Sequence, residues 1–309
     1  MRVLEFFCGI GGCAAALPPH ASVVAAIDIY DRALGVYAAN FPFPTYVRDI
    51  ESLGERDYRR WQADLWWMSP PCQPYTLRGK QRDDQDPRAR SLLALLEWID
   101  RYRPPYVALE NVPPFGTSRM WSRMQWVLER AGYCVATQEV CPTELGIPNR
   151  RRRFYMLAAR NHSITLSPPE GTPHVLAEYL LGPDEEDVWV PAGLLARYRH
   201  AIHILDDPTD PQAVVSCFTA AYGNSPVRSG SCLRSSEGVR RFTPREVARL
   251  MGFPDSFRLP DFCSRRQLWN MLGNSLSVPV VTWLLRHIPE LSDKTPPPHS
   301  NNNQCCVIQ

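Results

Sequence analysis

Short runs of apolar residues alternate with helix-like patterns along residues 1–160 of the chain. The runs have the length and the Gly, Pro or polar ends of buried strands. They predict strands at Val3–Phe7, Val23–Ile27, Asp64–Met68, Tyr106–Leu109 and Phe154–Ala158. Between them, apolar residues recur at helical spacing, for example in Arg90–Arg101 and Trp121–Ala131. This alternation indicates parallel βαβ units, so we predict an α/β fold, in which ligands bind at the carboxyl ends of the strands.

The pattern weakens between residues 161 and 240, where Pro, Gly and Ser often interrupt the chain. Helical patterning returns at Thr243–Glu246, which combines a Thr N-cap, Pro at the first helical position and Glu three residues after the cap. A last helix is expected from about Pro279 to His287. We therefore expect a main domain from residues 1–160 plus 241–290, a small domain at 161–240, and a disordered Pro/Asn-rich tail at 291–309.

The composition is that of an ordinary globular protein, since the 309 residues are 44% hydrophobic and 21% charged. These proportions exclude a collagen, a coiled coil and a wholly disordered chain. No stretch reaches the roughly 18 uncharged apolar residues of a membrane span. The first residues lack the features of a signal peptide. The formal net charge is only +2, so an argument for nucleic-acid binding has to rest on local clusters of basic residues.

Ten cysteines in such a chain indicate free thiols in a reducing compartment. They form no paired C-x-x-C spacing, and no nearby His completes a zinc-binding set. We therefore expect no metal site.

A glycine-rich turn follows the first predicted strand. Gly9, Gly11 and Ala14 fit a nucleotide-binding pattern in which glycines let the backbone approach a ligand, and an Ala-rich helix is expected next. Asp28 lies 19 residues after Gly9, which suits a contact with ribose hydroxyls. Asp49 follows the short apolar run Thr45–Val47 and is either a partner for an adenine amine or a loop cap. The turn indicates a nucleoside cofactor, and a purely structural turn is the alternative.

Two reactive side chains follow neighbouring predicted strands. Ser69–Pro74 (SPPCQP) is a rigid loop in which a Cys72 thiolate would be a nucleophile. A buried Cys in a turn is the alternative. Glu110 follows the next strand, where it can protonate or hydrogen-bond a heteroaromatic ring. Taken alone, such a Glu is more often a helix cap or an ion-pair partner, but Cys72 one strand away favours a catalytic role.

Four consecutive arginines, Arg150–Arg153, lead into the predicted strand at Phe154–Ala158. Because side chains alternate along a strand, Arg151 and Arg153 should point to one side and Arg150 and Arg152 to the other. We expect one pair to serve the active site and the other to meet solvent or a polyanion.

Six motifs occur in the order seen in cytosine-5 methyltransferases, and the chain resembles that family over about residues 2–288. The motifs are Phe7–Gly12 (FCGIGG), Pro70–Pro74 (PPCQP), Leu109–Val112 (LENV), the Arg151/Arg153 pair, Thr243–Pro254 (TPREVARLMGFP) and Leu272–Ser275 (LGNS). The resemblance implies a Rossmann-like α/β sheet with a small target-recognition domain. It also implies S-adenosylmethionine as the cofactor and disfavours NAD.

Finer features are similar to the branch of this family that methylates the anticodon loop of aspartate tRNA. Pro142–Asn149 (PTELGIPN) has Asn where DNA enzymes usually have Gln. Leu194–Pro208 and Cys217–Thr219 (CFT), before Tyr222-Gly223, also resemble that branch, and CFT is its most specific mark. Two departures, the Arg228–Ser231 run (RSGS) and a short recognition module, leave the exact tRNA open.

The resemblance implies a covalent mechanism. Cys72 would attack carbon 6 of a flipped-out cytosine, and Glu110 would hold the ring nitrogen and the exocyclic amine. Arg151 and Arg153 would hold the base carbonyl and organise these two groups. Carbon 5 then takes the methyl group, and loss of its proton expels Cys72. The residues implied for cofactor binding are Phe7, Gly9, Gly11, Asp28, Ile29, Asp49, Ile50, Asn274 and Ser275.

The residues assigned to substrate binding are Gln73, Arg78, Lys80, Cys217 and Tyr222. Basic residues after the Cys72 loop would form a flap over the polyanion. Solvated loop charge is the alternative, and the nearby Asp residues weaken the electrostatic case. Cys217 is either a second active-site thiol or a small buried residue of the recognition module.

The last four residues, Cys306–Gln309 (CVIQ), fit the C-a-a-X pattern for farnesylation, with Cys305 as a candidate palmitoylation site. No polybasic stretch precedes them, and such endings also occur by chance. A modified tail predicts a membrane-associated fraction beside cytoplasmic or nuclear protein.

Three functions stay open. The leading prediction is a tRNA cytosine-5 methyltransferase, as the resemblance to the tRNA branch implies. The lower cost of extruding a base from an unpaired loop than from a duplex also favours it. A DNA cytosine-5 methyltransferase would use the same chemistry, but the short recognition module and near-neutral charge count against it. The third is a non-catalytic nucleic-acid-binding relative, against which the intact Cys72, Glu110 and Arg151 argue.

Overall fold

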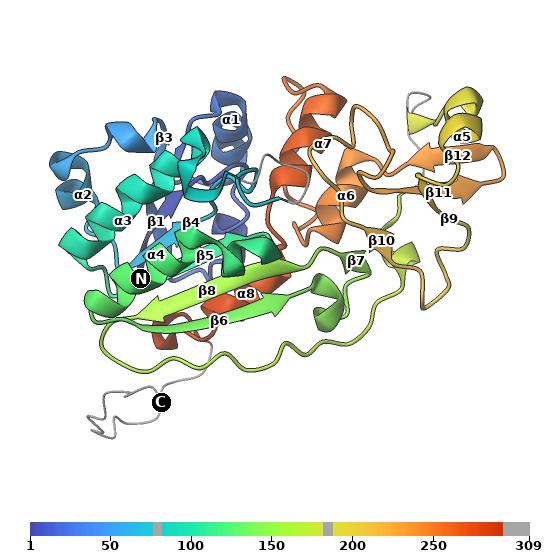
Figure 1. The fold of residues 1–309 in the computed structure, drawn as a ribbon. Helices are drawn as coiled ribbons and strands as arrows, with labels where there is room; N and C mark the ends of the chain where they lie inside the picture. The colour runs from blue at the N-terminus through green and yellow to red at the C-terminus, as the bar shows by residue number, and fades with distance from the viewer. Residues whose placement is uncertain (77–81, 182–187, 293–309) are drawn as a thin grey trace.

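The computed structural model describes residues 1–76, 82–181 and 188–292. Its centre is a seven-stranded sheet with the strand order β3-β2-β1-β4-β5-β8-β6 (Figure 1). β8 runs antiparallel to β5 and β6, whereas the other neighbouring strands pair in parallel. The strands are β1 (Arg2–Phe6), β2 (Ser22–Asp28), β3 (Thr45–Val47), β4 (Leu65–Met68), β5 (Tyr106–Asn111), β6 (Cys134–Val140) and β8 (Arg153–Ala159).

The predicted strands are all present, as β1, β2, β4, β5 and β8, and the predicted mixed α/β class is confirmed. Three features of the large sheet differ from the prediction. β8 is reversed, so the expectation of parallel units fails there. The edge strands β3 and β6 were not predicted. β3 has only three residues, none of them buried. β6 is mostly half-buried or exposed and carries polar residues between its apolar ones.

Alternation along the strands gives the sheet two apolar faces. On one face, Val3 of β1 and the buried side chains of β2, β4, β5 and β8 that point to the same side pack with α1, α6, α7 and α8. Leu4 and its counterparts pack on the other face with α2, α3 and α4 (Figure 1). The helices are α1 (Asp31–Asn40), α2 (Glu55–Trp61), α3 (Arg90–Tyr102), α4 (Arg119–Arg130), α6 (Pro244–Leu250), α7 (Arg265–Asn274) and α8 (Val278–Leu285).

The prediction of an Ala-rich helix after the glycine turn is wrong. Only one 3-10 turn, Ala14–Ala16, follows the glycines, and Leu17 is already extended. Pro18 and Pro19 lack N–H donors, and a residue before proline avoids the helical region, so the helix cannot continue.

A smaller lobe lies beside the large sheet (Figure 1). It contains α5 (Ala192–Tyr198) and a three-stranded sheet of β9 (His203–Leu205), β11 (Ser231–Ser235) and β12 (Gly238–Arg241). A short parallel pair, β7 (Asn149–Arg150) and β10 (Val215–Ser216), connects it to the main body. Parts of the 161–240 segment, including Ile164, Phe218 and Tyr222, pack with the main core. The packing therefore does not separate this segment from the main body at the predicted boundaries, which stay a prediction.

A buried ion pair joins the small sheet to α6. Arg240 of β12 donates to both carboxylate oxygens of Glu246 at 2.8 Å, and both side chains are almost completely buried. Glu246 also accepts hydrogen bonds from the backbone N–H groups of Thr243 and Leu181. It therefore completes the predicted capping box at Thr243 and links three segments of chain.

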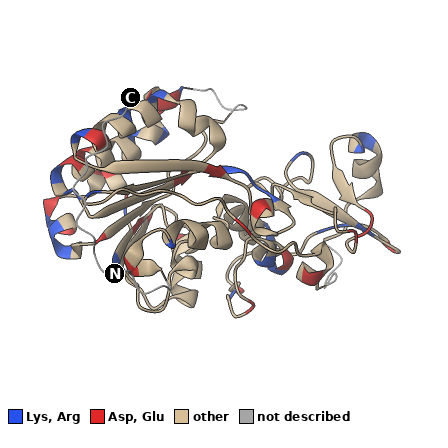
Figure 2. Cartoon of the chain, turned by 90° about the horizontal axis from the view of Figure 1, so that it is seen from below, with Lys and Arg blue, Asp and Glu red and all other residues tan. Residues whose placement is uncertain are grey.

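Basic and acidic residues are interspersed along the chain in both lobes (Figure 2). None of the described helices is long and apolar enough to cross a membrane.

Replacing Glu246 with Gln should lower the free energy of unfolding by about 3–5 kcal/mol, because it leaves the Arg240 charge buried without its partner. Urea unfolding followed by circular dichroism measures this loss. The matched control is Asp255→Asn, which breaks the exposed ion pair between Arg249 and Asp255 and should leave the unfolding midpoint almost unchanged. Equal effects of the two substitutions would contradict the structural role of the buried pair.

Candidate active site

A pocket of about 300 Å³ opens at the edge of the large sheet where β1, β2, β4 and β5 end. Its lining comes from the loops after these strands, from the segment before β8 and from the end of α7. The predicted site residues that line it are Phe7, Gly9, Asp28, Ile29, Cys72, Gln73, Glu110, Arg151, Arg153, Asn274 and Ser275. Residues far apart in the chain thus meet at one edge of the sheet, as strand-end positions predict.

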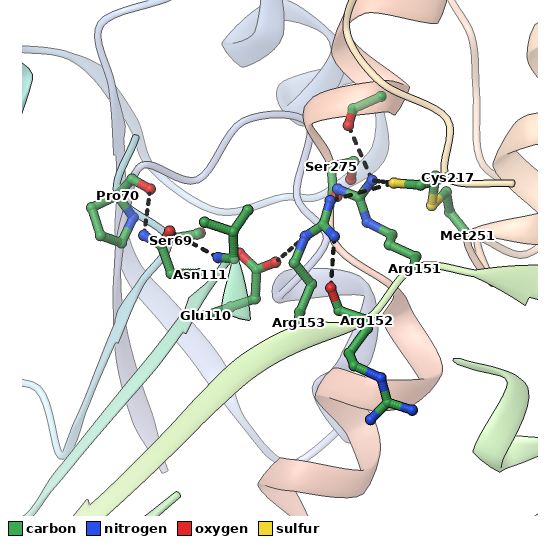
Figure 3. Close-up of polar contacts among 12 residues, drawn as sticks. Ser69, Pro70, Glu110, Asn111, Arg151, Arg152, Arg153, Cys217, Met251 and Ser275 are labelled. Atoms are coloured by element: carbon green, nitrogen blue, oxygen red, sulfur yellow. Dashed lines mark hydrogen bonds and ion pairs between the residues drawn. The ribbon is translucent and has the colours of Figure 1, made fainter. Parts of the chain in front are cut away.

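The reversal of β8 brings the arginines to this edge. Because β8 is antiparallel to β5, its first residues lie where β5 ends, and Glu110 pairs with Tyr155 in register. Arg151 is only 3% exposed and lines the pocket with Arg153. Arg152 points away from them (Figure 3) and pairs with Glu144 at 2.9 Å. This arrangement follows the alternation expected of a strand.

The loop that carries Cys72 is fixed to the end of β5. Asn111 is 1% exposed, and its Nδ2 donates a hydrogen bond of 3.1 Å to the carbonyl of Pro70 (Figure 3). The Asn111 side chain also accepts from the N–H of Val112 at 2.8 Å. Burial and the Glu110 carboxyl group raise the pKa of Cys72, and the two nearby arginines only partly offset this.

Glu110 lines the same pocket and is buried. Burial raises the pKa of its carboxyl group above the usual value, while Arg153 and Arg151 act in the opposite direction. Arg153 Nε lies 3.3 Å from Glu110 Oε1, and both side chains are mostly buried. The carboxyl group is therefore able to take up a proton at higher pH than an exposed Glu, which a hydrogen-bond donor to a heteroaromatic ring requires.

Arg151 connects three segments through its guanidinium group. Nη1 donates to the carbonyls of Phe218 at 3.1 Å and Gly273 at 3.2 Å, and Nη2 donates to the carbonyl of Ser275. These carbonyls belong to the segment after β10 and to the end of α7. Arg151 thus fixes the position of the LGNS segment beside the pocket.

Cys217 contacts both arginines but is not among the residues that line the pocket. Its Sγ is 3.5 Å from Arg151 Nη1 and 3.5 Å from Arg153 Nη2. Figure 3 shows Arg153 between Glu110 and Cys217. Cys217 therefore contacts the groups of the site without facing the space in which a ligand would sit.

The other end of the pocket has the features of a nucleoside site. Gly9 has a φ of +52°, and a Cβ added there would meet no atom within 4 Å, so the backbone faces open space. Its N–H donates to the Asp28 carboxylate at 2.8 Å, and the second carboxylate oxygen accepts from the N–H of Tyr30. Ile29 is 73% exposed at the pocket wall, where it offers an apolar surface to a flat ring. The exposed backbone at Gly9, the Asp28 carboxylate and the apolar side chain of Ile29 are the features that a nucleoside site needs. They therefore fit the nucleoside ligand that the glycine turn predicts.

Residues 1–180 and 198–290 match the family described as C-5 cytosine-specific DNA methylase. The chain belongs to this family. Among its relatives, the tRNA (cytosine(38)-C(5))-methyltransferase of Spodoptera frugiperda is 31% identical and covers 92% of this chain and 98% of its own. The enzyme of the same name from Schizosaccharomyces pombe is also 31% identical, with 92% and 96% covered. The structure of the Entamoeba histolytica methyltransferase EhMeth is 26% identical, with a TM-score of 0.86 over 94% of this chain and 98% of the other.

Several residues expected to bind ligands in this C-5 cytosine methylase lie elsewhere. Gly11 has a φ of +91° and packs against Phe41 and Tyr37, so it shapes the turn without lining the pocket. Asp49 caps a 3-10 turn by accepting from the N–H of Glu51 at 3.0 Å, and its contact with an adenine amine stays a prediction.

Two further expected contacts are buried in cores. Ile50 is 4% exposed and packs in the core of the α2–α4 face. Tyr222 is 1% exposed, and its hydroxyl donates to the carbonyl of Ser231 and accepts from the N–H of Phe242. The structure thus gives Tyr222 a packing position, and its expected substrate contact stays a prediction. Arg78, Lys80, Cys305 and Cys306 lie outside the described residues.

Some pocket residues of the methylase were not predicted from the sequence. Asn270 and Met271 line the pocket from α7, and Ser69 and Tyr30 line it from loops. Asn270 precedes Asn274 by four residues on the same helix, a spacing that places both on one face and was a usable signal. Asn111, which fixes the Cys72 loop, stands inside the LENV motif, but its contact with Pro70 depends on how the two loops meet.

Nowhere in the described ranges do three or more His, Cys, Asp or Glu side chains gather as a metal site would require.

Replacing Arg151 with Met should lower the free energy of unfolding of the methylase by about 3 kcal/mol, because three buried carbonyls lose their donor. Urea unfolding measures the loss. The matched control is Arg152→Met, which removes only a half-exposed ion pair with Glu144 and should cost about 1 kcal/mol or less. A larger loss at Arg152 than at Arg151 would contradict the assigned contacts.

Proposed function

We propose that this C-5 cytosine methylase transfers a methyl group from S-adenosylmethionine to carbon 5 of a cytosine in the anticodon loop of a tRNA, with aspartate tRNA as the substrate. The observation that carries the proposal is that Cys72, Glu110 and Arg153 share one pocket with Gly9, Asp28 and Ile29. A nucleophile, an acid and a nucleoside site within the same cavity are what this transfer needs.

The cofactor would be held at the glycine turn. Gly9 lets the backbone approach it, the Asp28 carboxylate accepts from ribose hydroxyls, and Ile29 packs against the adenine ring. Asn274 and Ser275 complete this side of the pocket. Bound S-adenosylmethionine supplies an electrophilic methyl group.

Cys72 would start the reaction on the base. Its thiolate adds to carbon 6 of the extruded cytosine, and the electrons of the carbon 5–carbon 6 double bond make carbon 5 nucleophilic. After carbon 5 has taken the methyl group, a base removes the carbon 5 proton. The carbon–sulfur bond then breaks, the double bond re-forms and the thiolate leaves. Because the pKa of Cys72 is raised, its thiolate forms less readily in the free protein. The nearby arginines favour the thiolate, so their positive charge contributes to the activation of Cys72.

Glu110 would stabilise the adduct. Its raised pKa favours the protonated carboxyl group, which donates to the ring nitrogen and holds the exocyclic amine. Arg153, 3.3 Å from Glu110, is the guanidinium placed to hold both the carboxyl group and the base carbonyl. Arg151 donates mainly to backbone carbonyls, so we assign it the positioning of the pocket wall.

The choice of tRNA rests on the relatives and on sequence. The two curated relatives named above act on cytosine 38 of tRNA by their names, and each aligns over 92% of this chain. Asn149 and the CFT triplet at Cys217 resemble the same branch. DNA is the second candidate substrate, because the matched family is described by its DNA methylases.

Methyl transfer from labelled S-adenosylmethionine should appear in tRNA and not in duplex DNA, with the label at one anticodon-loop cytosine. Cys72→Ala should lower the rate by at least about a thousandfold, since it removes the nucleophile. Cys134→Ala is the matched control, because Cys134 lies in β6 away from the pocket. Label in DNA alone would replace the tRNA proposal, and label in neither polymer with the cofactor still bound would favour a non-catalytic relative.

In the presence of S-adenosylmethionine, RNA that carries 5-fluorocytosine at the target position should form a stable adduct with the wild-type protein, because carbon 5 is methylated while it still carries fluorine. Fluorine cannot leave carbon 5 as a proton does, so the carbon–sulfur bond to Cys72 persists. Denaturing gel electrophoresis and peptide mass spectrometry detect the adduct. Its formation in the Cys72→Ala variant would show that another residue is the nucleophile.

Gly9→Ala should weaken binding of S-adenosylmethionine at least about tenfold, because the new methyl group enters the open space of the pocket. Gly132→Ala is the matched control, since Gly132 has a φ of +84°, equally open surroundings and no part in the pocket. Both changes place Ala in a left-handed conformation and cost about 1–2 kcal/mol of stability. Isothermal calorimetry separates the effects, and equal affinities of the two variants would contradict the assigned cofactor position.

A further inference from the structure

One sulfur atom connects both arginines of the site. Cys217 Sγ lies 3.5 Å from Arg151 Nη1 and 3.5 Å from Arg153 Nη2 (Figure 3). Arg153 in turn lies 3.3 Å from Glu110. A chain of polar contacts therefore runs from Cys217 through Arg153 to Glu110, the acid of the proposed reaction.

Buried positive charge needs a negative partner. The other hydrogen bonds of Arg151 go to neutral backbone carbonyls, and Arg153 otherwise contacts the carbonyl of Arg152 and the Glu110 side chain. In the described part of the chain, Cys217 and Glu110 are the acidic groups in direct contact with these guanidiniums. If Glu110 is protonated for catalysis, Cys217 is the group left to balance the charge.

The two half-buried thiols of the site respond in opposite ways to their surroundings. Burial disfavours ionisation of Cys217, but Arg151 and Arg153 outweigh it together, so the pKa of Cys217 falls below the usual value. The pKa of Cys72 is raised, because burial and Glu110 outweigh the same two arginines. Direct contact with both guanidiniums accounts for the behaviour of Cys217.

We propose that Cys217 is a positioning residue whose thiolate is the counter-ion of Arg151 and Arg153 and thereby keeps Glu110 protonated for the base. The inference rests on the proposed function for its consequence at Glu110, although the thiolate itself does not depend on activity. Cys217 acts through the arginines, because its sulfur contacts both guanidinium groups and the residues that line the pocket do not include it.

The charge effect has a definite sign. The negative sulfur offsets part of the positive field that the arginines apply to Glu110 and Cys72, so removing it favours the ionised forms of both and lowers both pKa values. The titratable and charged groups around the cluster are Cys72 after β4, Glu110 in β5, and Arg151, Arg153 and Tyr155 before and in β8. The segments at Phe218, Gly273 and Ser275 contribute backbone carbonyls to it.

The first test is alkylation of the full chain with iodoacetamide over a series of pH values, with the rate at each cysteine followed by peptide mass spectrometry. Cys217 should reach half of its maximal rate at lower pH than Cys72 and below about 8.5, the value of a free thiol. A midpoint at or above that of Cys72, or no reaction at any pH where Cys72 reacts, would overturn the proposal. This test needs no methyl transfer, so it stands if the proposed function fails.

The second test compares Cys217→Ser, a neutral side chain of similar size, with Cys217→Asp, which restores a negative charge. The single-turnover pH–rate profile on tRNA should move to lower pH by about 0.5–1 unit in the Ser variant. It should return towards the wild-type position in the Asp variant. A Ser profile that coincides with that of the wild type would overturn the proposal, whatever the change in maximal rate. A wild-type protein inactive on RNA and DNA would refute the proposed function instead and leave the alkylation result decisive.

Discussion

The reversed strand β8 is the constraint on which the active site depends. In an all-parallel sheet, the residues that precede a strand lie at the edge opposite the ligand. Because β8 runs against β5, the segment before it reaches the same edge as the loops that carry Cys72 and Glu110. Strand alternation then selects Arg151 and Arg153 for the interior and leaves Arg150 and Arg152 to solvent. One change of direction in the sheet therefore supplies the positive charge of the pocket.

That positive charge is tolerated because most of its donors have partners, although the Nε of Arg151 is buried without one among the described residues. Backbone carbonyls take most of the Arg151 donors, and the Arg153 guanidinium lies between a carboxyl group and a thiol. The same arginines affect the reactivity of the acidic groups, since burial raises the pKa values of Cys72 and Glu110 and the nearby positive charge opposes this rise. Structure and chemistry are thus linked through desolvation: a more open pocket would ionise Glu110 and lose the donor that the base requires.

Much of the fold was predictable from sequence because buried strands here are short apolar runs with clear ends. The misses have physical causes. β6 is a half-exposed edge strand without a continuous apolar run, and strand direction leaves no mark on composition. The helix after the glycine turn failed because Pro18-Pro19 outweighed the helix propensity of three alanines. In the site, the predicted residues at the ends of the central strands line one pocket. Asp49 follows the outermost strand and lies outside the pocket, and the burial of Tyr222 depends on the ring of Phe218 and the backbone of Phe242.

Among the described residues, the small lobe has a very limited core of its own, which consists of four buried apolar residues and a few half-buried neighbours. The four are Val190, Ile202, Cys232 and Val239. Such a cluster buries too little apolar surface to offset the loss of chain entropy on folding alone. The ion pair between Arg240 and Glu246 and the β7–β10 pairing attach it to the main body. The lobe is therefore not a transplantable module: excised or grafted onto another protein it would not fold, and its sequence can diverge only as far as its attachment to α6 allows.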